Sequence, residues 1–288
     1  MSHRREIGPG SRLWHFAGDH RMAFTGLSAG LLQLLHPAIG AGVVQHSDFF
    51  NDPWDRIVRS VPQIMGVIYD PEPERIGHRV RDYHRRINGR DDRDRPYRAL
   101  DPDTFWWAHA TFQSAVEQVA DRFDAHRLRP PEREELYLDG VEWYRRYGVS
   151  MQPVPADRVA FGEVWDHIVD EQLELNPAAE RAIDMALHSR PRDLKFLPAW
   201  TRPLHPVVVG PVLRLCAVGG LPEAVRRRFA IPWRVDEEVE YRMFQLGVRE
   251  LFRVLPASRR YGRTATRGYQ ARRRLEQAAQ AHIEDGAA

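Results

Sequence analysis

The sequence has almost no cysteine and almost no lysine. Cys216 is the only cysteine in 288 residues, so the chain cannot form an internal disulfide. The apolar neighbours of Cys216, Leu215 and Ala217 among them, indicate a small buried core residue rather than a reactive thiol. Lys195 is the only lysine among 42 basic residues. This cysteine usage favours a reducing compartment.

Segregated charge and a secretory signal are missing as well. The 42 basic and 40 acidic residues are interleaved and leave a net charge of +2. No compact basic tract with aromatic residues precedes the last thirty positions, which argues against a nucleic-acid-binding protein. Residues 1–10 lack an apolar core and a small-residue cleavage site, so we expect a cytoplasmic protein.

The longest stretch without charge does not have the pattern of a membrane span. Residues 22–47 contain no Asp, Glu, Lys or Arg, but His36 and Pro37 interrupt the stretch. This pattern predicts two buried helices joined at His36-Pro37. A second apolar stretch, residues 207–221, is too short and contains Arg214. We therefore expect no membrane span.

Strand-like alternation is nearly absent, and helix start signals recur along the chain. The dipeptide Asp52-Pro53 offers an N-cap followed by proline at the first helical position, and Asp101-Pro102 does the same. Residues 206–209 form the one β-rich word, which Gly210-Pro211 cuts short. The expected fold is an all-α globular domain of roughly ten helices. The helices are expected over residues 54–69, 73–89, 102–123, 130–147, 157–175, 177–189, 222–229 and 235–255, besides the two within 22–47.

His84 is the candidate functional residue that the helical pattern singles out. Ile76, Val80 and Ile87 lie at helical spacing around it within the helix expected over 73–89. The stripe turns inward and carries the imidazole with it. A buried imidazole requires a partner, which is a carboxylate, a backbone carbonyl or an iron.

Short catalytic motifs are absent. The sequence contains no HExxH, CxxC, Walker A or GxSxG word and no paired ExxH words. Glu163 and His167 stand four residues apart, a spacing more common for a surface pair than for a metal site. His109, next to Trp106 and Trp107, is a second inward histidine.

Several words in a fixed order resemble a known family. They are Ser11-Arg-Leu-Trp14, Leu35-His-Pro-Ala-Ile-Gly40 continuing to His46-Ser47, Asp52-Pro-Trp54, Arg56-Ile-Val-Arg59-Ser60, Arg81-Asp-Tyr-His84, Tyr97-Arg-Ala-Leu-Asp-Pro102 and Trp107-Ala-His109. Together they resemble the MpaB-type oxygenases, which include the latex clearing proteins, or rubber oxygenases. The resemblance extends from about residue 11 to about residue 267.

The resemblance implies a globin-like helical fold that holds haem b and uses dioxygen. It places the axial iron ligand at His84. The Arg-x-x-Lys-Thr word of the rubber oxygenases corresponds to Arg56, Arg59 and Ser60, which become the expected catalytic residues. Arg59 replaces the lysine, and because arginine does not deprotonate, lysine-type ligation of iron is put in doubt. His109, His36 and His46 are further candidates for contact with the cofactor.

These observations predict a haem-dependent oxygenase that acts on a hydrophobic small molecule. Two alternatives remain open: a haem enzyme of the peroxidase or peroxygenase type, and a non-catalytic helical protein that binds a lipid or pigment. The expected organisation is a disordered N-terminus at 1–10, an oxygenase-like domain at 11–257 and a basic C-terminal helix and tail at 258–288. Substrate identity and oligomeric state do not follow from the sequence.

Overall fold

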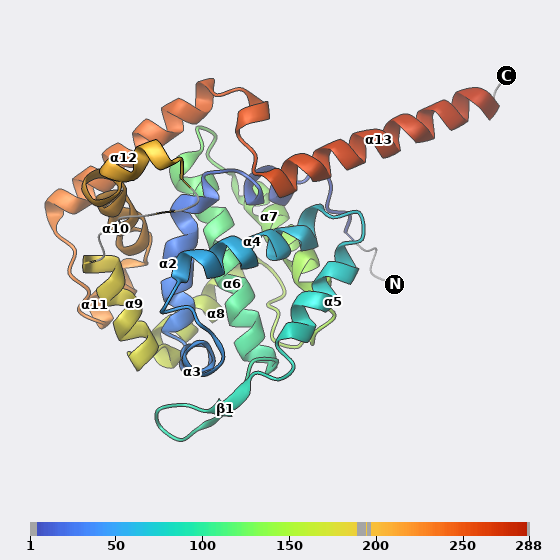
Figure 1. The fold of residues 1–288 in the computed structure, drawn as a ribbon. Helices are drawn as coiled ribbons and strands as arrows, with labels where there is room; N and C mark the ends of the chain where they lie inside the picture. The colour runs from blue at the N-terminus through green and yellow to red at the C-terminus, as the bar shows by residue number, and fades with distance from the viewer. Residues whose placement is uncertain (1–4, 189–193, 195–196, 287–288) are drawn as a thin grey trace.

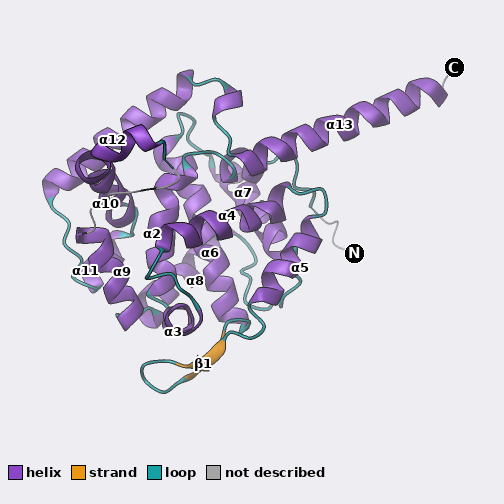
Figure 2. Ribbon diagram, viewed as in Figure 1, coloured by secondary structure: helices purple, strands orange, loops and turns teal. Residues whose placement is uncertain are grey.

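The computed structural model describes residues 5–188, 194 and 197–286, and helices dominate this part of the chain (Figures 1 and 2). The α-helices are α1 (Arg12–Ala17), α2 (Met22–Leu34), α3 (Pro37–His46), α4 (Pro53–Tyr69), α5 (Pro73–Tyr83), α6 (Pro102–Gln118), α7 (Pro130–Arg145), α8 (Arg158–His167), α9 (Pro177–His188), α10 (Gly210–Gly219), α11 (Glu223–Arg228), α12 (Val235–Val254) and α13 (Arg263–Gly286). Shorter helical turns are η1 (Val119–Phe123), η2 (Ile168–Gln172), η3 (Ala199–Leu204), η4 (His205–Val209) and η5 (Ala257–Arg259). The all-α prediction is confirmed, with thirteen α-helices in the described residues instead of about ten.

Side-chain caps begin several helices where the sequence predicted them. The Asp52 carboxylate accepts a hydrogen bond from the Asp55 backbone N–H at 3.0 Å, and Pro53 occupies the first turn of α4. The Asp101 carboxylate accepts from the backbone N–H groups of Asp103 and Thr104 at the start of α6. These caps satisfy N–H groups that have no partner within the helix.

The uncharged stretch folds as two helices, as predicted. α2 runs through the middle of the molecule and packs against α6 and α10 (Figure 1). α3 turns away from α2 by 97° at Leu35-His36. Among the described residues, no single helix has the length and apolar character needed to cross a bilayer, and only the bent pair of α2 and α3 meets that criterion.

Aromatic side chains fill the core between α6 and α7. Trp106, Trp107 and Trp143 are each at most 2% exposed. Cys216 on α10 is buried as predicted, and burial raises the pKa of its thiol to about 12. A thiol in this setting is not a nucleophile at neutral pH.

One local prediction was wrong. α5 ends at Tyr83 and does not continue to Gly89, because Asn88–Arg90 forms strand β1 and pairs antiparallel with β2, Pro96–Arg98. The β-rich word Pro206–Val209, which Gly210-Pro211 was expected to cut short, is helical and belongs to η4. The end of α5 does not follow from the local sequence alone.

Ion pairs hold the loop of this hairpin. The Arg95 guanidinium pairs with Asp91 at 2.7 Å inside the loop and with Glu174 at 2.8 Å outside it. Tyr97 of β2 is buried, and its hydroxyl donates to the Gln45 side chain at 2.8 Å. The hairpin is therefore fastened to α3 and to the segment before α9.

The N-terminal residues and the start of the last helix contact the helical body. Ile7 is fully buried, and Arg5 pairs with Asp139 at 2.5 Å. α13 begins against α4 and then projects outward (Figure 1). Residues 1–4, part of the predicted disordered N-terminus, lie outside the described residues, and the boundaries predicted at 11, 257 and 258 remain predictions.

Candidate functional site

His84 lies directly after α5 and caps its C-terminal end. Its Nδ1 is 2.8 Å from the backbone oxygen of Val80, one turn earlier. A carbonyl oxygen only accepts hydrogen bonds, so this contact assigns the proton to Nδ1 and leaves a lone pair on Nε2. The imidazole is half-buried and meets the ring of Phe105, on α6, edge to face at a centroid distance of 5.7 Å.

The surroundings of His84 keep its imidazole neutral. Burial lowers the pKa of His84, and the positive charge of Arg56 lowers it further, whereas the hydrogen bond to Val80 opposes both effects. A neutral imidazole with a free ring nitrogen is the form that binds a metal ion. His84 can therefore offer the lone pair of Nε2 to a metal ion.

Arg56 on α4 is the predicted catalytic residue that the structure brings into electrostatic reach of His84. Its guanidinium donates a hydrogen bond to the Ser47 hydroxyl, at the C-terminal end of α3. Burial lowers the pKa of Arg56, and the nearby charge of Arg59 adds to the effect. Arg56 thus offers a positive charge held in place by a second helix.

Arg59 and Ser60 are placed differently from Arg56. The Arg59 side chain is 66% exposed and pairs with Asp55, one turn earlier, at 2.7 Å. Ser60 is half-buried on the same helix. The structure therefore separates the two arginines of this word, since Arg56 is half-buried beside α3 and Arg59 is solvated.

The first half of α4 leaves apolar surface uncovered. Val58 and Val61 are 51% and 40% exposed, whereas Met65 and Ile68, farther along the helix, are 8% and 1% exposed. The helix is strongly amphipathic, so its apolar stripe is expected to be covered along its whole length. The uncovered part lies on the same half of α4 as Arg56.

His109 is enclosed in the aromatic core. Its Nε2 is 3.0 Å from the backbone oxygen of Gly140, and its Nδ1 is buried without a hydrogen-bond partner. The rings of Trp143 and Tyr144 lie 4.7 and 5.0 Å away, centroid to centroid. Burial lowers the pKa of His109 to about 3. Aromatic rings thus pack directly against this imidazole.

The remaining two histidines lie at opposite ends of α3. His36 is the N-cap residue, and burial lowers its pKa to about 4. His46, in the last turn, is exposed, and its Nε2 is 3.1 Å from the backbone oxygen of Asn88 in β1. α3 thus places His46 beside Ser47, the partner of Arg56, and His36 about three turns away.

Sequence reasoning missed two neighbours of this site, Ser47 and Phe105. Ser47 ends the uncharged stretch over residues 22–47, and Phe105 lies in the helix expected over residues 102–123, so both positions lie in or beside predicted helices. Their contacts with Arg56 and His84 depend on how α3, α4, α5 and α6 pack against one another. The spacing of residues along the sequence does not predict how these helices pack.

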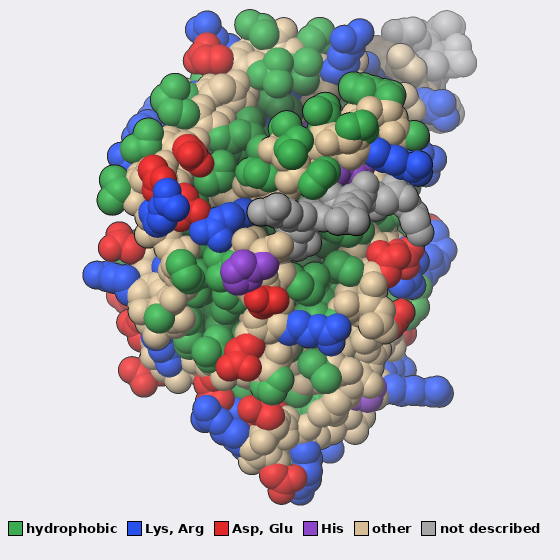
Figure 3. Space-filling view, turned by 60° about the vertical axis from the view of Figure 1, so that its left-hand side comes forward, with side chains coloured by type: hydrophobic (Ala, Val, Ile, Leu, Met, Phe, Trp, Pro, Cys, Tyr) green, Lys and Arg blue, Asp and Glu red, His purple; other side chains and the backbone are tan. Residues whose placement is uncertain are grey.

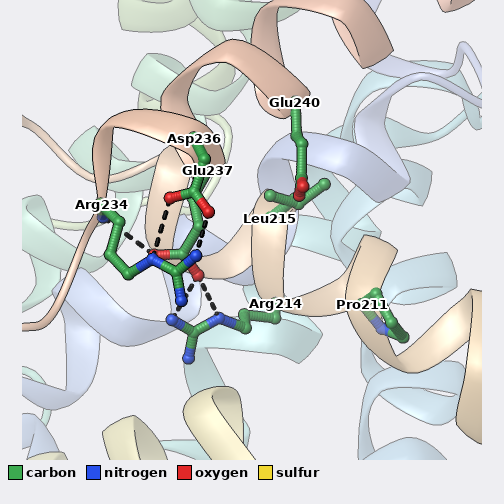
Figure 4. A pocket seen from close by; sticks show the side chains of 7 residues that line it. All are labelled: Pro211, Arg214, Leu215, Arg234, Asp236, Glu237 and Glu240. Atoms are coloured by element: carbon green, nitrogen blue, oxygen red, sulfur yellow. Dashed lines mark hydrogen bonds and ion pairs between the residues drawn. The ribbon is translucent and has the colours of Figure 1, made fainter.

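Two surface hollows are lined by other residues. One, of about 260 Å³, lies between α10 and the start of α12, where Arg214 pairs with Glu237 and Arg234 with Asp236 (Figure 4). The other, of about 390 Å³, lies beside α1 and includes His15 and Asp139. Within the described residues, no group of three or more His, Cys, Asp or Glu side chains is arranged to hold a metal ion.

Comparison with known proteins identifies one family. The model of the family described as "ER-bound oxygenase mpaB/B'/Rubber oxygenase, catalytic domain" matches residues 14–273. No curated protein and no solved structure was found to match the chain.

Proposed function

The chain belongs to the mpaB/B' and rubber oxygenase catalytic-domain family, and from this membership we propose that it is a haem b-dependent oxygenase acting on a hydrophobic small molecule. The observation that carries the proposal is the hydrogen bond from His84 to the Val80 carbonyl, which leaves Nε2 free in a neutral imidazole. Haem needs one such nitrogen on one side of its ring. Iron in the bound haem would supply the activation of dioxygen.

An aromatic ring and a guanidinium near His84 fit a flat apolar group with charged edges. Phe105 covers one side of the imidazole, and Arg56 is close enough to affect its charge. Arg56 offers guanidinium donors that can bind a propionate carboxylate or stabilise negative charge developing on a reacting oxygen. An apolar surrounding also excludes water from the reaction.

The chain departs from the rubber oxygenases at Arg59. A lysine at this position can lose its proton and bind a metal ion, whereas a guanidinium stays charged and offers no lone pair. Arg59 is also turned to solvent beside Asp55. We therefore propose that Arg56, with Ser60 on the same helix, supplies the polar groups that contact the reacting oxygen. No basic amine takes this role.

Three histidines are less suited to bind iron. His109 has a buried Nδ1, but the rings of Trp143 and Tyr144 pack against its imidazole at centroid distances of 4.7 and 5.0 Å. His36 is buried at the start of α3, and His46 contacts β1 at the surface. We keep His84 as the proposed ligand on these grounds.

The test is haem binding by the purified protein. After expression with sufficient iron and a haem precursor, a pyridine haemochrome assay is expected to show haem b, and the His84→Ala variant is expected to lose it or to show a displaced Soret band. His46→Ala is the matched control, because the His46 side chain is exposed and contacts the backbone oxygen of Asn88 in strand β1. An unchanged Soret band in His84→Ala would refute the assignment, and its loss in His109→Leu instead would move it to His109.

The same preparation separates the remaining functions. Isotope-labelled dioxygen is expected to appear in the product of a hydrophobic unsaturated substrate. Turnover that requires added peroxide and leaves no label would identify a peroxygenase. Absence of haem would favour a binding protein.

A further inference from the structure

α12 carries apolar side chains on two opposite faces. One face is buried in the body and includes Tyr241 and Phe252. The other face, at helical spacing, is open to solvent, and its four apolar side chains are 83%, 55%, 62% and 47% exposed: Val235, Val239, Met243 and Leu246. We call these four residues the α12 stripe. Figure 3 turns this side of the molecule forward and shows hydrophobic side chains open to solvent, with Asp and Glu side chains among them. A surface helix normally turns polar side chains outward, so a second apolar face indicates a second partner.

The first half of α12 is acidic as well as apolar. Residues 235–241 contain four carboxylates and no basic residue. Asp236 and Glu238 pair with arginines close in sequence, and exposed ion pairs of this kind are weak. Glu240 is exposed, borders the hollow between α10 and α12 (Figure 4), and forms no ion pair within the described residues. This part of the α12 stripe therefore suits a partner that is both apolar and basic.

α13 is the helix with the least covering. It begins on α4, where Gly268 lies against Tyr69, and then leaves the body (Figure 1). Residues 273–280 are all exposed. A short helix without a neighbour depends on its own backbone hydrogen bonds and is only marginally stable in water. The projecting part of α13 would therefore gain stability from a surface that covers it.

The projecting part of α13 has the composition that the α12 stripe requires. One face of it, at helical spacing, is apolar and consists of Ala271, Leu275, Ala278 and Ala279. Leu275 is 56% exposed. Arg272 and Arg274 lie on either side of this face, and residues 263–280 contain five arginines and one carboxylate. Arg272 is 3.4 Å from Glu6, whereas Arg274 is exposed and has no ion pair in the part of the chain that the structure describes.

We propose that α13 of one copy of the chain docks on the α12 stripe of a second copy. Leu275 would pack on Val239 and Met243, and Arg274 would pair with Glu240. The opposite charges of the two helices favour this contact over α12 on α12 or α13 on α13, which would bring like charges together.

The partner helix comes from another copy because of how α13 is held. Its first turns are packed on α4, and in Figure 1 its projecting part points away from the α12 of its own chain. Reciprocal docking of both α13 helices gives a two-fold dimer. The contact uses none of the residues proposed to bind haem, so it does not depend on the proposed function.

The test is self-association of the full-length protein in sedimentation velocity. The unaltered protein is expected to form dimers as its concentration rises from about 1 to about 100 μM. Arg274→Glu and Glu240→Arg are each expected to weaken the dimer at least about tenfold, because each brings like charges together. A chain that carries both substitutions is expected to recover most of the loss, since the pair is formed again with its charges exchanged. Leu275→Ser is expected to weaken the dimer through lost apolar contact.

The matched control is Arg127→Glu, which makes the same change of charge at an exposed residue outside α12 and α13. It should associate as the unaltered protein does, and circular dichroism verifies that every variant is folded. An unaltered protein that stays monomeric throughout this range would overturn the proposal. So would equal association of Arg274→Glu and the control, or a double variant that associates no more tightly than either single variant. A dimer that is lost only on Trp200→Ser would place the contact on η3 instead, where Trp200 is 76% exposed.

Discussion

At the scale of single residues, His84 and His109 are both neutral but differ in the nitrogen that stays free. His84 directs Nδ1 to its own helix and leaves Nε2 without a backbone partner. His109 directs Nε2 to Gly140 and leaves Nδ1 enclosed among aromatic rings. A sequence pattern places both on inward faces and cannot distinguish them, because the tautomer is set by carbonyls that the fold brings near.

His109 is expected to make stability depend on pH. Its pKa is about 3 in the folded protein and about 6.5 when unfolded, so the unfolded chain takes up a proton first as the pH falls. Stability is therefore lost below about pH 6.5, at up to about 1.4 kcal/mol per pH unit, until the pH approaches about 3. In urea unfolding at about pH 7 and about pH 5, His109→Gln should reduce the difference between the two free energies of unfolding by about 2 kcal/mol.

The pKa of His36 is about 4 in the folded protein, so His36 also lowers the free energy of unfolding as the pH falls. This contribution is the same in the unaltered protein and in every variant that keeps His36. The control is His46→Gln, since His46 is exposed. This variant should keep the pH dependence of the unaltered protein. Equal pH dependence in His109→Gln and the unaltered protein would show that His109 is protonated in the folded state.

At the scale of helices and strands, the predictions succeeded where the signal is local. The dipeptides Asp52-Pro53 and Asp101-Pro102 correctly predicted the starts of α4 and α6. His36-Pro37 correctly predicted the break between α2 and α3. The predicted end of α5 was wrong because Asn88-Gly89 is part of a hairpin. That hairpin pairs Asn88 with Arg98 and is fastened by Tyr97 to Gln45, so it depends on contacts remote in sequence.

The packing of α5 against the end of α7 depends on Gly77. A Cβ atom at this position would lie 2.1 Å from the backbone oxygen of Arg146, so the two helices can approach only at a glycine. Gly77→Ala is expected to lower the free energy of unfolding by about 1–3 kcal/mol or more, since backbone must move. It should also displace His84, which follows the same helix, and weaken the proposed binding of haem.

Gly247→Ala in α12 is the matched control. No atom lies within 4 Å of the Cβ that it would add, so alanine should stabilise the helix by about 0.5–1 kcal/mol. Chemical denaturation measures both changes. A Gly77→Ala protein as stable as the Gly247→Ala protein would show that α5 can shift along α7 at no cost.

At the scale of the whole molecule, the family and the helical class could be predicted, whereas the assembly of the site could not. Arg56 and His84 were predicted as site residues from the sequence. The position of Arg56, however, depends on its hydrogen bond to Ser47 at the end of α3. Arg59 shares the same word and lies on the same side of α4, but its side chain is exposed and pairs with Asp55. The packing of α3, α4, α5 and α6 therefore decides which of the two arginines lies near His84.

Arg21 joins three distant parts of the chain and is expected to stabilise the whole fold. It is 2% exposed and pairs with Asp19 at 2.8 Å, before α2, and with Asp124 at 2.8 Å, after η1. Its guanidinium also lies 5.0 Å from the centre of the Phe252 ring on α12. Arg21→Met leaves the buried Asp19 without its cation, so we expect a loss of about 3–5 kcal/mol in the free energy of unfolding.

Arg253→Met provides the comparison for Arg21→Met in urea denaturation. Arg253 is 65% exposed and pairs with Glu250 at 3.0 Å, so its removal should cost no more than about 1 kcal/mol. Adding Asp19→Asn to Arg21→Met should recover part of the loss, because the uncompensated buried charge is then removed. A loss in Arg21→Met as small as that in Arg253→Met would contradict the role of Arg21 as a stabilising link between these parts of the chain.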